Sequence, residues 1–169
     1  MISYQNSRRI LNKAKIKIKN ESILSINSLN RVSASNIYAK FNYPSGDNAA
    51  FDGYAINSND TKNLNKNKSK AFKIIGSISA GKKPINKRIN KYEAVEIMTG
   101  GIVPKGFDTI IPIEQVIVYP DKKNQKSIII NKKINKYNHV RFAGSDYKKN
   151  ELVIKKNTII LPNHILALK

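Results

Sequence analysis

The middle of the chain alternates between short apolar runs and groups of Gly, Pro and Asn residues, from Tyr38 to Val140. This pattern is typical of β-strands separated by turns. The predicted strands are residues 54–56, 72–75, 94–97, 109–111, 116–118 and 127–130. Residues 57–70 between the first two are rich in Asn and Lys and nearly free of apolar side chains, so we expect a mobile surface loop there.

The N-terminal end has helical patterning. Residues 3–15 predict a helix with Ile10, Leu11 and Ala14 on one face. Residues 15–19 alternate like a strand, although a solvated helix end fits equally well.

A second short helix is predicted over residues 22–29, followed by Asn30. Asn tolerates the left-handed conformation that often ends a helix. Near the C-terminus, residues 151–160 predict a strand and a turn, and Pro162 suits the first position of a helix that continues to Leu168. No Gly or Asn caps the end of that helix, so it is expected to be marginal.

Length and composition favour one or two small domains with a buried core. The chain has no Cys, so it has neither a disulfide framework nor a Cys-based metal site. Residues 1–20 lack the continuous apolar segment of a signal peptide, and no apolar run approaches the roughly 18 residues that span a bilayer. We therefore expect a soluble, cytoplasmic protein.

The net charge of +20 raises the question of nucleic-acid binding. Lys supplies 26 of the 31 basic residues and is scattered along the chain, whereas Arg, the better bidentate reader of guanine and phosphate, supplies five. Lys, Asn and Ile together make up 75 residues, and all three have A/T-rich codons. Genome composition explains this bias better than a polyanionic partner, so specific nucleic-acid binding is not expected.

The most informative segment is residues 44–55, with the sequence PSGDNAAFDGYA. It places Asp47 and Asp52, two of only eleven acidic residues, on a glycine-punctuated loop. Such loops carry chemistry in many folds. An Asp-Gly pair alone favours a hairpin turn at the surface, but a match of twelve ordered positions favours function.

This segment resembles the D-N-x-A-x-D-G-Y-A signature of the molybdopterin molybdotransferase family, which includes bacterial MoeA and the E domain of gephyrin. Residues 94–111 resemble the family's I-M-T-G-A-x-x-P-x-G-x-D-x-V-V. Weaker matches follow the family order: residues 29–32 for L-G-R-V, 80–82 for A-G-Q and 140–146 for R-x-x-G-E-D. The resemblance covers most of residues 23–169.

The resemblance implies an α+β, mostly β fold, in which a β domain of short twisted strands is inserted into a small helical domain. The expected division is a leading helix over residues 1–20, a discontinuous helical domain of residues 21–39 and 141–169, and the inserted domain over residues 40–140. In the family a pterin-binding domain and a final β domain follow. Both are missing here, so we expect a truncated chain rather than a natural short protein.

The resemblance also implies a reaction: insertion of molybdate into adenylylated molybdopterin, with release of AMP. Every reactant is an anion, so such a site needs cations, N–H donors and usually Mg²⁺. Asp52, Thr99 and Asp146 match active-site positions of the family. Asp52 is expected to be a Mg²⁺ ligand or a general base, and its alternative role is an Asx-turn acceptor.

Thr99 begins Thr-Gly-Gly, where backbone N–H groups could approach an oxyanion, although a strand-end Thr is more often a simple cap. Ser145 replaces the family's Glu beside Asp146, which removes one supporting carboxylate.

The residues expected at the substrate are Asp47, Asn48, Gly53 and Gly100. Asp47 and Asn48 are expected to shape the loop through bonds to backbone more than to touch substrate.

Other chemistries find little support in the sequence. His139 and His164 offer no metal pair, Ser77 and Ser79 lack the pattern of a hydrolase triad, and no Gly-rich phosphate loop is present. The family works as a homodimer in which these domains lend residues to the other subunit. The alternatives left open are a catalytically dead scaffold and a basic module that binds RNA or an acidic partner.

Overall fold

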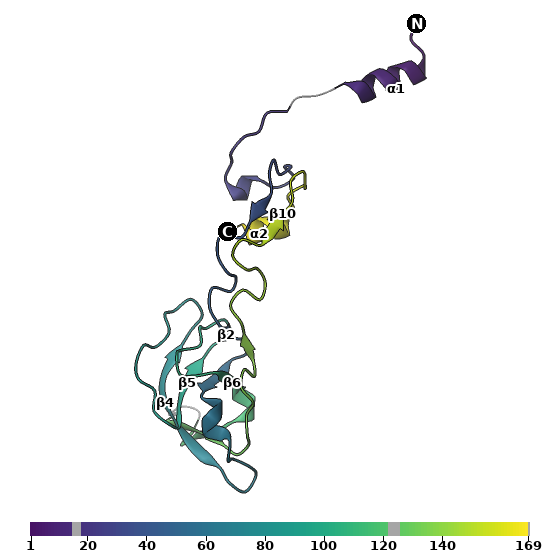
Figure 1. Ribbon diagram of the computed structural model, residues 1–169. Helices are drawn as coiled ribbons and strands as arrows, with labels where there is room; N and C mark the ends of the chain where they lie inside the picture. The colour runs from purple at the N-terminus through teal and green to yellow at the C-terminus, as the bar shows by residue number, and fades with distance from the viewer. Residues whose placement is uncertain (15–17, 122–125, 169) are drawn as a thin grey trace. The chain divides into compact units, whose positions relative to one another are not determined.

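The structure is a computed structural model that describes residues 1–14, 18–121 and 126–168 (Figure 1). The chain divides into two compact units. The larger is the continuous segment Tyr38–Glu151, and the smaller combines Met1–Ile37 with Leu152–Lys169.

A six-stranded sheet organises the described part of the larger unit, with the strand order β6-β3-β5-β4-β8-β7. Its strands are β3 (Gly53–Ile56), β4 (Lys70–Ile78), β5 (Glu93–Ile97), β6 (Thr109–Pro112), β7 (Ile117–Tyr119) and β8 (Ser127–Ile130). Neighbours pair antiparallel except β4 and β5, which run parallel. All six predicted strands are present, and the mostly β prediction is confirmed.

The centre of the sheet is buried on both faces. Successive residues of β3 point to opposite sides. Tyr54 and Ile56 therefore join one core cluster with Phe72 and Ile128, whereas Ala55 joins a second cluster with Val95. Because every residue of β3 is buried, this central strand is a rigid base for the loop that precedes it.

The loop predicted over residues 57–70 is more than a surface loop. It begins with a 3₁₀ helix, η2 (Ser58–Thr61), and it buries Thr61 completely and Leu64 almost completely. Thr61 receives the backbone N–H of Ile134 on its hydroxyl oxygen at 2.9 Å. The segment looked polar because its buried anchors are a threonine and one leucine among many Asn and Lys residues.

Two short strand pairs lie outside this sheet. Strand β2 (Asn48–Ala49) pairs with β9 (Val140–Arg141), and β1 (Ile37–Tyr38) pairs with β10 (Leu152–Ile154). A 3₁₀ helix, η3 (Ile113–Gln115), follows β6.

The smaller unit contains the predicted N-terminal helix, α1 (Tyr4–Lys13), which starts where the side chain of Ser3 accepts the N–H of Asn6. None of its residues is buried. The prediction over residues 15–19 lies largely outside the described residues.

The second predicted helix, residues 22–29, is wrong. Only the 3₁₀ helix η1 (Ser25–Asn27) forms there. The hydroxyl of Ser28 donates to the carbonyl of Ser25, a local bond that competes with regular helical hydrogen bonding. Asn30 does adopt the left-handed conformation expected of it, with φ 61°.

The C-terminal helix α2 (Pro162–Ala167) begins at the predicted proline. Its first turn is capped by His164, whose Nδ1 accepts the N–H of Leu161 at 3.1 Å. This cap was not predicted, because His is not among the residue types usually found in that role.

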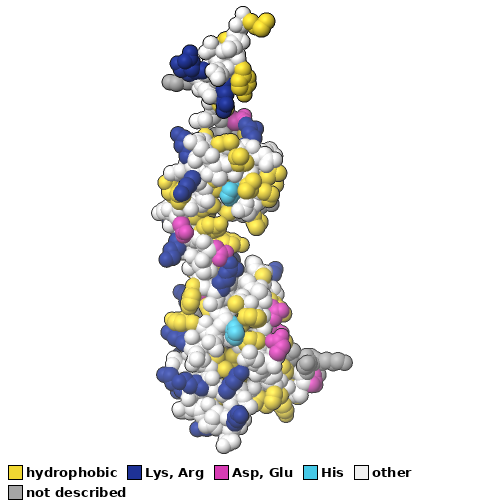
Figure 2. Space-filling model, turned by 90° about the vertical axis from the view of Figure 1, so that its right-hand side faces the viewer, with side chains coloured by type: hydrophobic (Ala, Val, Ile, Leu, Met, Phe, Trp, Pro, Cys, Tyr) yellow, Lys and Arg dark blue, Asp and Glu magenta, His cyan; other side chains and the backbone are white. Residues whose placement is uncertain are grey.

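Lys and Arg side chains are spread over the face shown in Figure 2, interspersed with polar and apolar side chains, rather than gathered in one patch. Within residues 1–14, 18–121 and 126–168, no helix is long and apolar enough to cross a membrane.

Candidate functional site

Three segments that are distant in sequence meet at β2. On one side of it, the N–H of Ala49 donates to the carbonyl of Gly101 at 2.9 Å, and the N–H of Gly100 donates to the carbonyl of Ala49 at 2.8 Å. On the other side, Asn48 lies opposite Arg141 in the β2–β9 pair. The acidic loop, the Thr-Gly-Gly turn and the segment before Asp146 therefore form one structure.

Asp52 and Thr99 are in direct contact. Asp52 immediately precedes β3 and Thr99 follows β5, and the antiparallel pairing of Gly53 with Ile97 brings these two strand ends together. The N–H and the hydroxyl of Thr99 each donate to Oδ1 of Asp52 at 2.7 Å. The N–H of Ile113 holds the backbone of Asp52 by donating to its carbonyl at 3.1 Å. Thr99 thus fixes the orientation of the Asp52 carboxylate.

These bonds also set the charge of Asp52. The N–H of Thr99, followed by its hydroxyl, lowers the pKa of the Asp52 carboxyl from its ordinary value. The side chain is exposed, and its second oxygen, Oδ2, has no hydrogen-bond partner recorded among the described residues. Asp52 is therefore a firmly ionised carboxylate that presents one oxygen to solvent.

The backbone of the Thr-Gly-Gly turn does not form the expected anion site. The N–H of Thr99 donates to Asp52, that of Gly100 to Ala49, and that of Gly101 to the carbonyl of Met98 at 2.8 Å. All three donors are used within the chain. Gly100 is needed for conformation, since its φ is 80°.

Gly53 lies inside the sheet, beside Asp52. A Cβ at this position would be 2.0 Å from the carbonyl oxygen of Ile111 on β6. The missing side chain lets β3 and β6 approach closely at the point where Asp52 leaves the sheet.

Asp146 forms an ion pair with the guanidinium of Arg141, and its backbone N–H donates to the carbonyl of Tyr43 at 2.9 Å. Both side chains are partly exposed. Arg141 was not among the predicted site residues, although it opens the same R-x-x-G-S-D segment. The guanidinium of Arg141 supports Asp146 even though Ser145 stands where the family pattern has a glutamate.

Asp47 holds two loops, as expected of a loop-shaping residue. Its Oδ1 accepts the N–H of Ala143 at 2.9 Å, and its carbonyl accepts the N–H of Val103 at 2.9 Å. Asn48 is held by its backbone instead, because its buried Oδ1 has no partner among the described residues.

The described residues contain no group of three or more His, Cys, Asp or Glu side chains that could hold a metal ion. His139 packs its ring edge-to-face on Phe51, with centroids 4.9 Å apart. His164 belongs to helix α2. A cation bound to Asp52 would therefore need further oxygen ligands that a cluster of these side chains does not supply, such as waters or substrate oxygens.

Comparison with known proteins gives consistent matches. The family model described as "MoeA N-terminal region (domain I and II)" matches residues 2–169. A molybdopterin molybdenumtransferase of Staphylococcus aureus strain Mu50 is 33% identical over 141 residues, which are 83% of this chain and 32% of that protein. A protein of the same name from Staphylococcus epidermidis is 28% identical over 155 residues, 92% of this chain and 36% of that protein.

Two solved structures of the molybdopterin biosynthesis moeA protein of Pyrococcus horikoshii share the fold. Both are 28% identical to this chain, with TM-scores of 0.78 and 0.80. The matches cover 88% and 99% of this chain, and 38% and 41% of the archaeal chains. The chain spans about a third of the length of its curated relatives.

Proposed function

Because the chain belongs to the family described as MoeA N-terminal region (domain I and II), we propose that it is the N-terminal part of a molybdopterin molybdotransferase of molybdenum-cofactor biosynthesis. The reaction is insertion of molybdate into adenylylated molybdopterin with release of AMP. The observation that carries this proposal is the Asp52 carboxylate held by both donors of Thr99, since these residues come from the two most specific family motifs.

The geometry favours one of the two roles considered for Asp52. A general base works best with a pKa near the operating pH. The hydrogen bonds from Thr99 lower the pKa of Asp52, which makes its carboxylate a weaker proton acceptor. We therefore assign Asp52 the role of an ionised ligand for a cation and Thr99 the role of its positioning residue.

Mg²⁺ suits this arrangement. It commonly binds through one or two carboxylates while keeping waters and substrate phosphate oxygens as its other ligands. Oδ2 of Asp52 supplies one such ligand, and no protein cage is required. When bound, the ion would shield phosphate charge from the carboxylate.

The other site residues support this arrangement. We propose that Asp146, braced by Arg141, contributes to the active site from the neighbouring turn. Asp47 and Asn48 hold the substrate-facing loop, Gly100 allows the turn after Thr99, and Gly53 lets Asp52 emerge from the packed sheet.

We further propose that this segment acts together with the pterin-binding and C-terminal domains of the family, as part of a cytoplasmic homodimer. The carboxylates here would repel molybdate and phosphate unless cationic and N–H groups from those domains surround them. The chain alone is therefore expected to be inactive.

The direct test mixes the purified chain with adenylylated molybdopterin, molybdate and Mg²⁺ and follows AMP release. We expect no turnover from the chain alone and turnover after adding the missing C-terminal half as a separate polypeptide. Multiple turnovers without that half would contradict the proposed division of labour. A reconstituted complex that forms but stays inactive would favour the scaffold alternative.

A further inference from the structure

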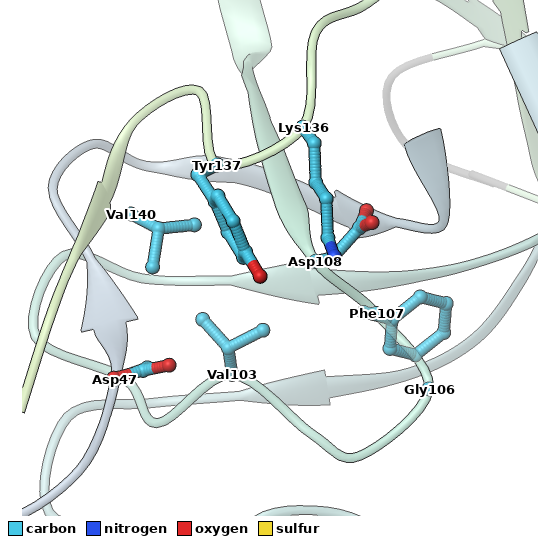
Figure 3. A pocket seen from close by; sticks show the side chains of 8 residues that line it. All are labelled: Asp47, Val103, Gly106, Phe107, Asp108, Lys136, Tyr137 and Val140. Carbon is cyan, nitrogen blue, oxygen red and sulfur yellow. The ribbon is translucent and has the colours of Figure 1, made fainter. Parts of the chain in front are cut away.

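A cavity of about 280 Å³ lies in the larger unit (Figure 3). Asp52, Thr99 and Asp146 do not line it. Its apolar walls are the side chains of Val103, Phe107 and Val140 and the ring of Tyr137. The volume is just below the range of roughly 300–1,000 Å³ typical of sites for drug-sized ligands, so it suits a smaller molecule.

The loops that line this open cavity are fixed by hydrogen bonds. The N–H of Tyr137 donates to the carbonyl of Asp108 at 2.9 Å, and the hydroxyl of Thr109 donates to the carbonyl of Asn135 at 3.0 Å. On the facing loop, the side-chain amide of Asn57 donates to the carbonyl of Gly106 at 3.1 Å. The cavity is therefore preformed.

Tyr137 has a strained backbone. Its φ is 67°, a conformation that bulky residues adopt rarely. Such strain persists only where the surroundings hold it, and it is concentrated at ligand and active sites. Here it sets the tyrosine ring as one wall of the cavity, with its hydroxyl reaching into the space between Val140 and Val103 (Figure 3).

The charges in the cavity are separated. At one end, both oxygens of Asp108 accept from Ser58, from its N–H at 2.7 Å and its hydroxyl at 2.9 Å. Lys136 reaches the same end, where its ammonium lies over the ring of Tyr137, 4.6 Å from the centroid. The hydrogen bond with Tyr137, and more weakly the charge of Asp108, raise the pKa of Lys136. Asp108 is thus satisfied by Ser58, and the ammonium of Lys136 is held by Tyr137.

Asp47 lies at the opposite end (Figure 3). Its Oδ1 accepts the N–H of Ala143, whereas its Oδ2 has no recorded partner among the described residues. Asp108 is engaged by Ser58 and Lys136 by Tyr137, so Asp47 is the charged group of this lining that keeps an oxygen for a ligand. An anionic ligand would meet Asp47 unfavourably, and a cationic one would neutralise it.

We propose that this cavity binds a small amine or amidine, whose cationic head pairs with Asp47 and whose flat apolar body packs between Val103, Val140 and the ring of Tyr137. This inference shares one residue with the proposed function, the loop anchor Asp47, and uses none of the other groups assigned to the reaction. A single aromatic ring with an amidinium group has the required size and charge.

The test uses benzamidine as the probe and benzamide, its neutral counterpart, as the ligand control. Amide NMR signals of the full chain are followed during titration. We expect benzamidine to shift the signals of Val103, Phe107, Tyr137 and Val140 saturably, and benzamide to bind about 10- to 100-fold more weakly, the effect of losing one charge-assisted hydrogen bond.

Asp47→Asn tests the protein side of the pair. Asparagine keeps an oxygen for the N–H of Ala143 and changes the remaining position from acceptor to donor, so folding should persist. We expect benzamidine affinity to fall about 10- to 100-fold in this variant. Asp60→Asn is the matched control, because Asp60 also accepts a backbone N–H, that of Tyr92 at 3.0 Å, but does not line the cavity.

Equal binding of benzamidine and benzamide by the unchanged chain would overturn the proposal, and that comparison does not depend on any variant folding. Shifts confined to residues outside the cavity would also overturn it. Neither result would bear on AMP release, so failure here is separate from failure of the proposed function.

Discussion

Thr99 places two hydrogen-bond donors, its N–H and its hydroxyl, on the same oxygen of Asp52, each at 2.7 Å. The contact joins residues 47 positions apart in sequence. It fixes one carboxylate oxygen inside the loop and leaves the other for a ligand. The orientation of the carboxylate therefore depends on a residue from a different motif.

Thr99→Val should raise the pKa of Asp52 towards its ordinary value, because it removes the hydroxyl donor while keeping the N–H. Carboxyl ¹³C NMR titration of Asp52 measures this directly, with Thr99→Ser as the control that retains the hydroxyl. A lowered native pKa contributes stability above the unfolded pKa, and this contribution is lost as pH falls through the native value. In the valine variant, the free energy of unfolding should therefore depend less steeply on pH in the acid range. An Asp52 pKa that does not change in this variant would contradict the assigned cause.

Asp52→Asn, in the complex reconstituted with the C-terminal half, should reduce AMP release on the order of 100-fold or more. The asparagine oxygen can still accept from Thr99, and the side chain is exposed, so the midpoint of thermal unfolding should fall only slightly. Unchanged turnover would remove Asp52 from the mechanism.

Gly53→Ala should lower the free energy of unfolding by about 3 kcal/mol, because the new Cβ would overlap the carbonyl of Ile111. Gly81→Ala is the control. No heavy atom lies within 4 Å of its Cβ position, so only the left-handed φ of 75° should cost stability, about 1–2 kcal/mol. Urea denaturation of both variants gives the comparison, and equal losses would mean that strand packing is not the cause.

Thr61→Val should destabilise the chain by about 1–3 kcal/mol, since it leaves the buried N–H of Ile134 without its acceptor. Thr61→Ser keeps the hydroxyl and should cost much less. If the two variants unfold at the same denaturant concentration, the hydrogen bond is not what anchors this loop.

Polynucleotide binding by the chain should be weak, independent of sequence and abolished by physiological salt, because its scattered lysines make few simultaneous phosphate contacts. A salt titration with labelled single-stranded RNA measures this. Sub-micromolar affinity at physiological salt, with a base preference, would support the RNA-binding alternative.

The sheet could be predicted because apolar runs and turn residues report strands locally, as at residues 54–56 and 94–97. The parallel pairing of β4 with β5 could not be predicted, because nothing in either strand specifies its partner. The helix expected over residues 22–29 was wrong, because the hydroxyl of Ser28 bonds locally to the carbonyl of Ser25 and only a short 3₁₀ helix forms.

In the candidate site, too, local motifs could be predicted from the sequence and contacts between distant segments could not. Motifs identified Asp52 and Thr99 as candidates, but their contact depends on the β3–β5 register. The ion pair of Arg141 with Asp146 and the cavity at Tyr137 depend on how loops pack, and periodicity carries no information about that packing.

The smaller unit is built from two segments at opposite ends of the chain, and this has a consequence for folding during synthesis. Ile160 exchanges backbone hydrogen bonds with Asn30 and Arg31, so this part of the fold cannot close until residues near 160 have left the ribosome. At about 5–20 residues per second, the roughly 130 intervening residues take on the order of 6 to 26 seconds to make. During that interval the inserted sheet can already fold, while the backbone groups of Asn30 and Arg31 wait for Ile160, their hydrogen-bond partner. The smaller unit is therefore completed last, after every strand of the sheet that interrupts it in sequence has been made.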